Sequence, residues 1–136
     1  MPEHSGVYLA PADTSALRRT ATRGKLAWIE FDSGEARNKP QFLAACARDL
    51  EFPDGFGGNW DALADCLQDL SWRPAPGHVV LWRGVSRLAR AAPDDLATAL
   101  EIFRDTASYW KERGRVFIAL LDQQVRGVAL QQLPGS

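Results

Sequence analysis

The sequence predicts an α/β fold in which a small three-stranded parallel sheet packs with about four helices, with an additional strand and helix at the N-terminus. Short apolar runs of strand length alternate along the chain with longer segments whose apolar residues recur at helical spacing. This alternation favours parallel strands joined by helical crossovers. The length of 136 residues, without an internal repeat or a linker, indicates one hydrophobic core.

The first elements are expected near the N-terminus. Residues 6–10 form a candidate strand, and Asp13 is placed to cap a short helix over residues 14–21. Residues 25–32, KLAWIEFD, carry apolar side chains on both of their faces. They therefore predict a strand that is covered on two sides.

Two helices are expected after this strand. Asn38 and Pro40 mark the start of the first helix. Its apolar residues, which recur at helical spacing, are Phe42, Leu43, Cys46 and Leu50. A loop over residues 51–58 follows, and Asn59 is a favourable N-cap for a second helix that extends through Leu70.

The second half of the chain continues the alternation. Residues 78–82, HVVLW, form the clearest buried strand, and a short helix is expected over residues 86–91. A long helix begins at Pro93 and stops at Gly114, a residue type suited to the left-handed position after a helix. Residues 115–121, RVFIALL, form the last strand.

The chain is expected to divide into a main domain and two flanking segments. The domain spans residues 25–121. Residues 1–24 form an N-terminal extension that packs on or near this domain. Residues 122–136 contain Gln, Gly and Pro and form a tail that we expect to be loosely ordered.

Composition and charge restrict the classes of function. The 16 basic and 17 acidic side chains leave a net charge of −1, so there is no general attraction to nucleic acid or to an anionic membrane. No apolar run approaches the length of a membrane span, and the N-terminus lacks the features of a signal peptide. Cys46 and Cys66 are interpreted as buried thiols in a reducing compartment. We expect a cytoplasmic monomer without a membrane or direct nucleic-acid partner.

The segment FPDGFGGNWDALADCL, residues 52–67, runs from a glycine-rich turn into a helix. Such turns can hold phosphate at a helix N-terminus. However, Gly55, Gly57 and Gly58 fit neither the P-loop nor the dinucleotide fingerprint. Asp61 also places a carboxylate in the first helical turn, where an anion would bind. The simpler interpretation is a tight turn that needs positive φ angles.

The helix after this turn has one acidic face. On a helical wheel, Asp61, Asp65, Asp69 and Gln68 lie within an arc of about 100°, opposite the apolar side. Like charges four residues apart cost roughly 0.2–0.5 kcal/mol per pair, and no Lys or Arg lies among them. A solvated helix surface is one interpretation of this pattern. A surface that meets a cationic partner is the other.

The long helix repeats this arrangement. Glu101, Asp105 and Glu112 fall on the side opposite its apolar stripe. Arg104 and Lys111 flank them and could form ordinary surface ion pairs. Both interpretations therefore stay open for this second face.

Catalytic and metal-binding patterns are absent from the sequence. The two histidines are His4, near the terminus, and His78, at a strand start, where a structural or solvent-facing role is expected. A carboxylate pair such as Asp61 and Asp65 could serve acid–base or metal chemistry, but no nucleophile or ligand set accompanies it. We expect no enzyme activity, no cofactor and no metal.

Residues 52–67 resemble the central loop and helix of the barstar family of ribonuclease inhibitors. The shared pattern is a proline-bearing loop, an aromatic residue with Gly-x-Asn, and then hydrophobic-Asp-Ala-Leu-x-Asp-Cys-Leu. The resemblance extends over residues 25–121. It implies a three-stranded parallel sheet with about four helices. It also implies a cytoplasmic inhibitor or immunity protein that blocks a basic, secreted ribonuclease with acidic side chains in place of RNA phosphates.

The resemblance further implies a set of partner-binding residues. Asp61 and Asp65 match the two helix aspartates of the family motif, with Asp65 as the central anchor. Asp105 matches an acidic residue of the late helix. The other candidates surround these three and are Gly55, Phe56, Asn59, Gln68 and Asp69.

Three positions depart from the type member of the family. Gly55 stands where that inhibitor has a tyrosine, Ala64 where it has a tryptophan, and Gln68 where it has a threonine, whereas Phe56 keeps a loop aromatic. Large aromatic side chains often carry much of the energy of an interface. A second hypothesis therefore stays open, in which the same fold binds or regulates a basic partner that is not a nuclease.

Overall fold

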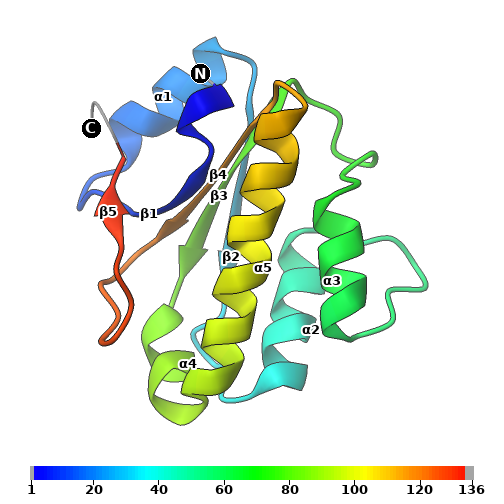
Figure 1. Ribbon diagram of the computed structural model, residues 1–136, viewed down its shortest axis with the longest axis vertical. Helices are drawn as coiled ribbons and strands as arrows, with labels where there is room; N and C mark the ends of the chain where they lie inside the picture. The colour runs from blue at the N-terminus through cyan, green and yellow to red at the C-terminus, as the bar shows by residue number, and fades with distance from the viewer. Residues whose placement is uncertain (1, 134–136) are drawn as a thin grey trace.

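The computed structural model describes residues 2–133, which fold as a parallel sheet with helices on both faces (Figure 1). Five strands run through these residues in the order β2-β3-β4-β1-β5, and all neighbouring strands are parallel. The strands are β1 (Gly6–Leu9), β2 (Ala27–Asp32), β3 (Gly77–Arg83), β4 (Val116–Leu121) and β5 (Gln131–Gln132). The predicted alternation of strands and helices is confirmed.

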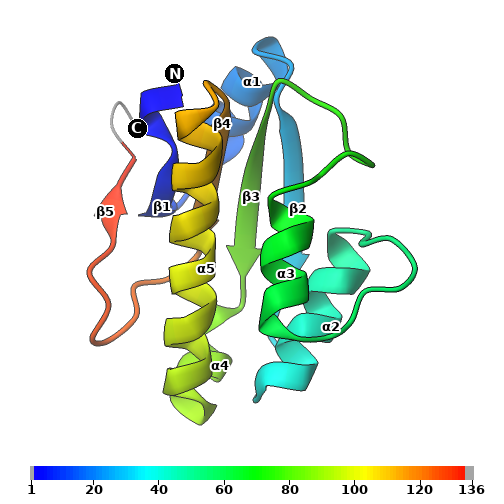
Figure 2. The same cartoon turned by 45° about the vertical axis from the view of Figure 1, so that its right-hand side comes forward.

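The described part of the chain also forms five α-helices and a short 3-10 turn. They are η1 (Pro2–His4), α1 (Ser15–Arg23), α2 (Lys39–Asp49), α3 (Trp60–Leu67), α4 (Val85–Ala91) and α5 (Pro93–Glu112). Helix α1 lies on one face of the sheet, whereas the other helices lie on the opposite face (Figures 1 and 2). The Asn38 side chain caps α2 as predicted, since Oδ1 accepts from the Gln41 N–H at 3.0 Å.

The expected three-stranded sheet is wrong in its number of strands. Strands β2, β3 and β4 are the three expected for the main domain. Strand β1 adds to them by pairing with β4, with Gly6 opposite Ile118 and Leu9 opposite Leu121, and β5 pairs with β1. Because β5 consists of two exposed glutamines, no apolar pattern in the sequence marks it as a strand.

The expectation of a loosely ordered tail is wrong for residues 122–133. Val125 and Leu130 are buried in the larger apolar layer. The Arg104 guanidinium also donates to the Ala129 carbonyl at 3.5 Å. Val125 and the short apolar run over residues 128–130 lie among polar residues and are too few to give a periodic signal, which is why the sequence does not reveal this packing. Residues 134–136 lie outside the described residues, and the division into a main domain and two flanking segments stays a prediction.

The sheet separates two apolar layers. Val80 and Trp82 of β3 face the layer formed with α2, α3, α4 and α5. Val79 and Leu81 face the opposite layer, where Ala21 of α1 packs against the sheet. Neighbouring residues of β3 thus enter opposite layers, as the two-residue period of a strand requires. The predicted burial of this strand is confirmed.

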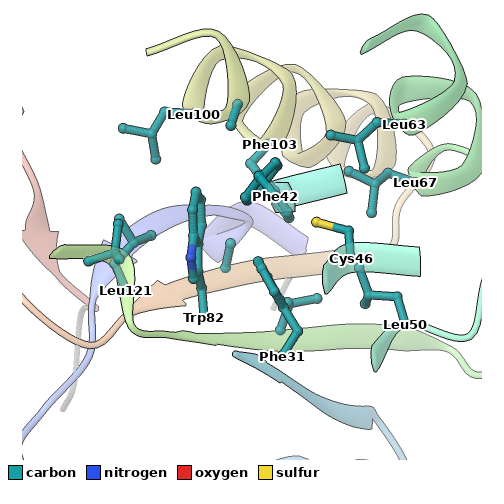
Figure 3. Packing of buried hydrophobic residues seen from close by; sticks show 14 of the residues in the cluster. Phe31, Phe42, Cys46, Leu50, Leu63, Leu67, Trp82, Leu100, Phe103 and Leu121 are labelled. Atoms are coloured by element: carbon teal, nitrogen blue, oxygen red, sulfur yellow. The ribbon is translucent and has the colours of Figure 1, made fainter. Parts of the chain in front are cut away.

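Trp82 lies at the centre of the larger layer (Figure 3). Its ring centroid is 5.1 Å from that of Phe42 on α2 and 5.5 Å from that of Phe103 on α5. The Trp82 indole N–H donates to Ser33 Oγ at 2.7 Å, so the polar atom of this buried ring has a partner. Cys46 packs in the same layer and is buried as expected.

Candidate partner-binding surface

Asn59 begins helix α3 as predicted. Its backbone is extended, and its Oδ1 accepts a hydrogen bond from the Ala62 N–H at 2.7 Å. Asp61 lies in the first turn of the helix, where the helix dipole favours a carboxylate. The Asn59 side chain is therefore occupied by a hydrogen bond within the protein. It affects the candidate surface by fixing where α3 begins.

Helix α3 ends at Leu67, three residues before the predicted end at Leu70. Leu70 adopts a φ of 53°, its N–H donates to the Cys66 carbonyl at 3.1 Å, and its side chain is buried. The sequence does not signal this turn, because leucine rarely adopts a left-handed backbone. Asp69 consequently lies in the turn after α3 and not on the helix itself.

The predicted acidic face of α3 is confirmed for its two helical aspartates. Asp61 and Asp65 are exposed, whereas Leu63 and Leu67 on the opposite side are fully buried. Gln68 is the C-cap residue and is half-buried at the end of the same face. The apolar contacts of α3 thus hold the helix so that its carboxylates point to solvent.

The glycine-rich loop before α3 adopts a backbone that requires glycine. Gly55 has a φ of +91° and Gly58 a φ of +67°, and an added Cβ would meet nothing within 4 Å at either position. The left-handed backbone, and not crowding, is therefore the reason for glycine at these two positions. This geometry confirms the interpretation of the segment as a tight turn.

Phe56 anchors this loop to the fold through an aromatic contact. It is half-buried, and its ring lies 4.9 Å from Phe52, which lies 5.9 Å from Trp72. The Trp72 indole N–H in turn donates to the Leu50 carbonyl at 3.1 Å. The supporting role of Phe52 and Trp72 was not predicted from the sequence. Phe52 precedes α3 and Trp72 follows it, and neither belongs to the apolar stripe of a helix, which is the signal that could have indicated a contact between them.

Helix α5 packs beside α3 (Figures 1 and 2). The indole N–H of Trp110 on α5 donates to the Leu67 carbonyl at the end of α3, at 2.9 Å. Glu101 and Asp105 are exposed on α5, whereas Phe103 between them is fully buried. The structure therefore brings together the two helices that carry the predicted acidic residues.

Many acidic side chains outside this region stabilise the fold. Glu30 accepts from Arg83 at 3.0 Å, and Asp49 accepts from Arg48 at 2.8 Å. Asp95 accepts from the Lys39 N–H at the start of α2, at 3.0 Å. These carboxylates are not available to a partner without a loss of intramolecular contacts.

The acidic side chains of the loop before α3, of α3 with the turn after it, and of α5 lack such partners within the fold. Seven acidic side chains of this region form no hydrogen bond or ion pair with any described residue through their carboxylates. They are Asp54, Asp61, Asp65, Asp69, Glu101, Asp105 and Glu112. Arg104, a candidate for an ordinary surface pair on α5, donates to a main-chain carbonyl instead. We call these seven carboxylates the unpaired acidic surface. Glu35 and Asp94 share this lack of a partner elsewhere in the chain.

Two carboxylates of this surface contribute to the raised pKa of the Cys66 thiol. The pKa of the Cys66 thiol is raised, first by partial burial and then by the negative charges of Asp69 and Asp65. A raised pKa keeps the thiol protonated and weakly nucleophilic at neutral pH. Cys66 is half-buried, so the expectation of a buried thiol is wrong for this residue.

Other polar groups of interest have structural roles. His78 is buried at the start of β3, and its Nε2 lies 2.7 Å from the Arg73 carbonyl oxygen, so its expected structural role is confirmed. Across residues 2–133, no three His, Cys, Asp or Glu side chains come together in a way that could hold a metal ion. None of the helices in the described chain is long and apolar enough to cross a membrane.

The fold and the surface define a class of protein: a small parallel α/β protein that presents unpaired carboxylates on two adjacent helices. The family model described as Barstar (barnase inhibitor) matches residues 26–122, and the chain belongs to this family. This range agrees within one residue at each end with the extent of the resemblance seen in the sequence. No curated protein matches the chain.

Proposed function

We propose that this protein is an inhibitor or immunity protein that binds a basic ribonuclease, or a related nuclease toxin, and blocks its active site. The observation that carries the proposal is the unpaired acidic surface on α3, its preceding loop and α5. Membership of a family described as barnase inhibitors supports it.

The proposed mechanism is phosphate mimicry. A ribonuclease holds the phosphates of its substrate with cationic side chains, and the carboxylates of α3 would meet the same groups. Asp61 and Asp65 are separated by about 6 Å along the helix axis and lie on one face. Complementary charge would accelerate association, and buried hydrogen-bonded pairs would slow dissociation.

The residues have different roles in this proposal. Asp65, in the middle of α3, is the central anchor, and Asp61 and Asp105 flank it. Gln68 and Asp69 extend the contact at the end of the helix. The other proposed contact residues shape the approach of the partner and are Gly55, Phe56 and Asn59. The proposed protein is a cytoplasmic monomer without enzyme activity, cofactor or metal.

A second candidate is a regulatory protein that binds a basic partner other than a nuclease. Gly55 and Ala64 favour this candidate, because neither offers the large aromatic side chain that anchors many interfaces. An inhibition assay separates the two candidates. A captured basic protein without nuclease activity would favour the second candidate.

Capture of a partner from the source organism tests the proposal directly. The bait proteins are the wild type, Asp65→Ala, and Glu35→Ala as a matched control. Glu35 is exposed and unpaired like Asp65, but it lies in the loop between β2 and α2. We expect the wild type and Glu35→Ala to retain a basic nuclease that Asp65→Ala loses. Equal retention by all three would remove Asp65 from the site.

The electrostatic part of the mechanism has its own test. The association rate of the inhibitor with the nuclease should fall between about 0.01 M and about 0.15 M salt, since the Debye length shortens from about 30 Å to about 8 Å. Stopped-flow fluorescence measures this rate. A rate that does not change with salt would contradict electrostatic steering.

A further inference from the structure

Helix α1 lies on the face of the sheet opposite to α3 (Figure 1), and its outer side carries a cluster of basic residues. Its inner side packs Leu17 and Ala21 against the sheet. Its outer residues line a shallow, open hollow of about 480 Å³ and are Ser15, Arg18, Arg19, Thr22 and Arg23. The outer side of α1 thus offers three guanidinium groups within nine residues of chain.

These cations have few acidic partners. Arg18 lies 3.6 Å from Glu30, which also accepts from Arg83 at 3.0 Å. Arg19 and Arg23 form no ion pair with any residue from 2 to 133. The nearest acid before the helix is Asp13, which accepts from the Ser15 N–H at 2.9 Å and from the Ser15 side chain. The pKa of Asp13 is lowered first by these bonds and to a smaller extent by the charge of Arg19, which does not lie within ion-pair distance. From residue 14 to residue 29 the chain contains basic residues and no acid.

We propose that the outer face of α1 binds the phosphodiester backbone of RNA. Arginine is suited to this role because its planar guanidinium forms charge-assisted, bidentate hydrogen bonds with phosphate. The net charge of −1, which led us to expect no direct nucleic-acid partner, gives no general attraction to RNA. The binding therefore depends on this local cluster alone.

The composition of α1 favours a nucleic-acid backbone over a membrane. A helix that lies on a membrane turns large apolar side chains toward the lipid. The apolar side chains of α1, Leu17 and Ala21, face the sheet instead. The helix also lacks an aromatic residue on which a base could stack, so we infer binding without sequence preference.

The basic surface is independent of the proposed inhibitor function. It lies in residues that precede the family match, which begins at residue 26. The unpaired acidic surface would repel RNA, and the two surfaces lie on opposite faces of the sheet. RNA on α1 and a basic protein on α3 could therefore bind at the same time.

Fluorescence anisotropy with a short labelled RNA duplex tests the proposal. If α1 neutralises three phosphates, the affinity should fall about 40-fold between about 50 mM and about 200 mM salt, because counterions are released on binding. The triple variant Arg18→Gln, Arg19→Gln, Arg23→Gln should lose at least about tenfold in affinity at the lower salt. Circular dichroism checks that the variant is folded.

A charge-matched control removes the same number of cations elsewhere. This control is the triple variant Arg87→Gln, Arg90→Gln, Arg126→Gln. It should bind RNA like the wild type, since these residues lie on α4 and in the tail.

A double variant, Arg19→Glu with Arg23→Glu, keeps the contact between Arg18 and Glu30 and should also lose RNA binding. Equal losses in both triple variants would overturn the proposal. The proposal would also be overturned if the protein bound anionic vesicles, or self-associated in a salt-sensitive way, without binding RNA.

Discussion

The indole N–H of Trp110 donates to the main-chain carbonyl of Leu67 at 2.9 Å. Leu67 is the last residue of α3, and Trp110 lies in the last turn of α5. The last carbonyl groups of a helix have no partner inside that helix, so this bond satisfies one of them. It also fixes the position of α3 relative to α5 and therefore connects the two parts of the unpaired acidic surface.

The variant Trp110→Phe should lower both stability and partner affinity. The loss of the hydrogen bond leaves a half-buried carbonyl without its partner, which costs about 1–3 kcal/mol in the free energy of unfolding. Urea denaturation measures this change. Partner affinity should fall as well, because the end of α3 is no longer held against α5.

Trp28→Phe is the control for this prediction. The Trp28 indole N–H donates to Glu30 at 2.9 Å, and the side chain packs in the layer beneath α1. This variant should lose stability without a change in partner affinity. If Trp110→Phe binds the partner as well as Trp28→Phe does, the connection between the helices has no role in binding.

The variant Asp65→Asn should make the protein more stable and a weaker binder. It relieves the repulsion with Asp61, which is worth roughly 0.2–0.5 kcal/mol at low salt. Asp122→Ala should have the opposite effect on stability, because Asp122 accepts from the Gly84 N–H at 2.8 Å. Thermal denaturation at low salt compares the two. A loss of stability in Asp65→Asn would mean that this carboxylate has a structural partner.

The variant Gly55→Ala should destabilise the protein by about 1 kcal/mol, because alanine is strained at a φ of +91°. Gly57→Ala is a matched control in the same loop. An added Cβ at Gly57 would make ordinary contacts, the nearest at 3.5 Å, and its φ is not positive. Urea denaturation should show little change for Gly57→Ala. The same strain would oppose an aromatic residue at position 55.

Stability should fall on mild acidification because of His78. Burial lowers the pKa of His78, so the folded protein binds fewer protons than the unfolded chain once the pH falls below about 6.5. Its contribution to stability is therefore complete above that pH and decreases as the pH falls through the lowered pKa. Denaturation at a series of pH values should show this decrease in the wild type but not in His78→Gln.

Carboxylates act in a separate pH range. The pKa of Glu30 is lowered mainly by the hydrogen bond from Trp28, and that of Asp49 mainly by the bond from Arg48. Their contributions are present above pH about 4.5 and are lost as the pH falls through the lowered values. A wild-type stability that is constant between pH about 6.5 and about 5 would contradict the role assigned to His78.

The candidate surface could be predicted in part because its signals are local. The side of α3 that carries Asp61 and Asp65 follows from helical periodicity, and the start of α3 follows from the cap at Asn59. The end of α3 could not be predicted in the same way. Leu70 combines a left-handed backbone, which is rare for leucine, with a side chain buried in the core, and its burial depends on distant parts of the fold.

The alternation of strands and helices, the acidic face of α3 and the family could all be predicted from the amino-acid sequence, since each depends on residues close together in the chain. The tertiary structure alone decided the sheet order, the placement of β1 between β4 and β5, and the contact of α3 with α5. These depend on hydrogen bonds and burial between distant segments, such as the 3.0 Å bond from the Phe117 N–H to Ser5 Oγ. The structure also decided which carboxylates are paired within the fold. A composition with nearly balanced charges cannot reveal which of them remain free to meet a partner.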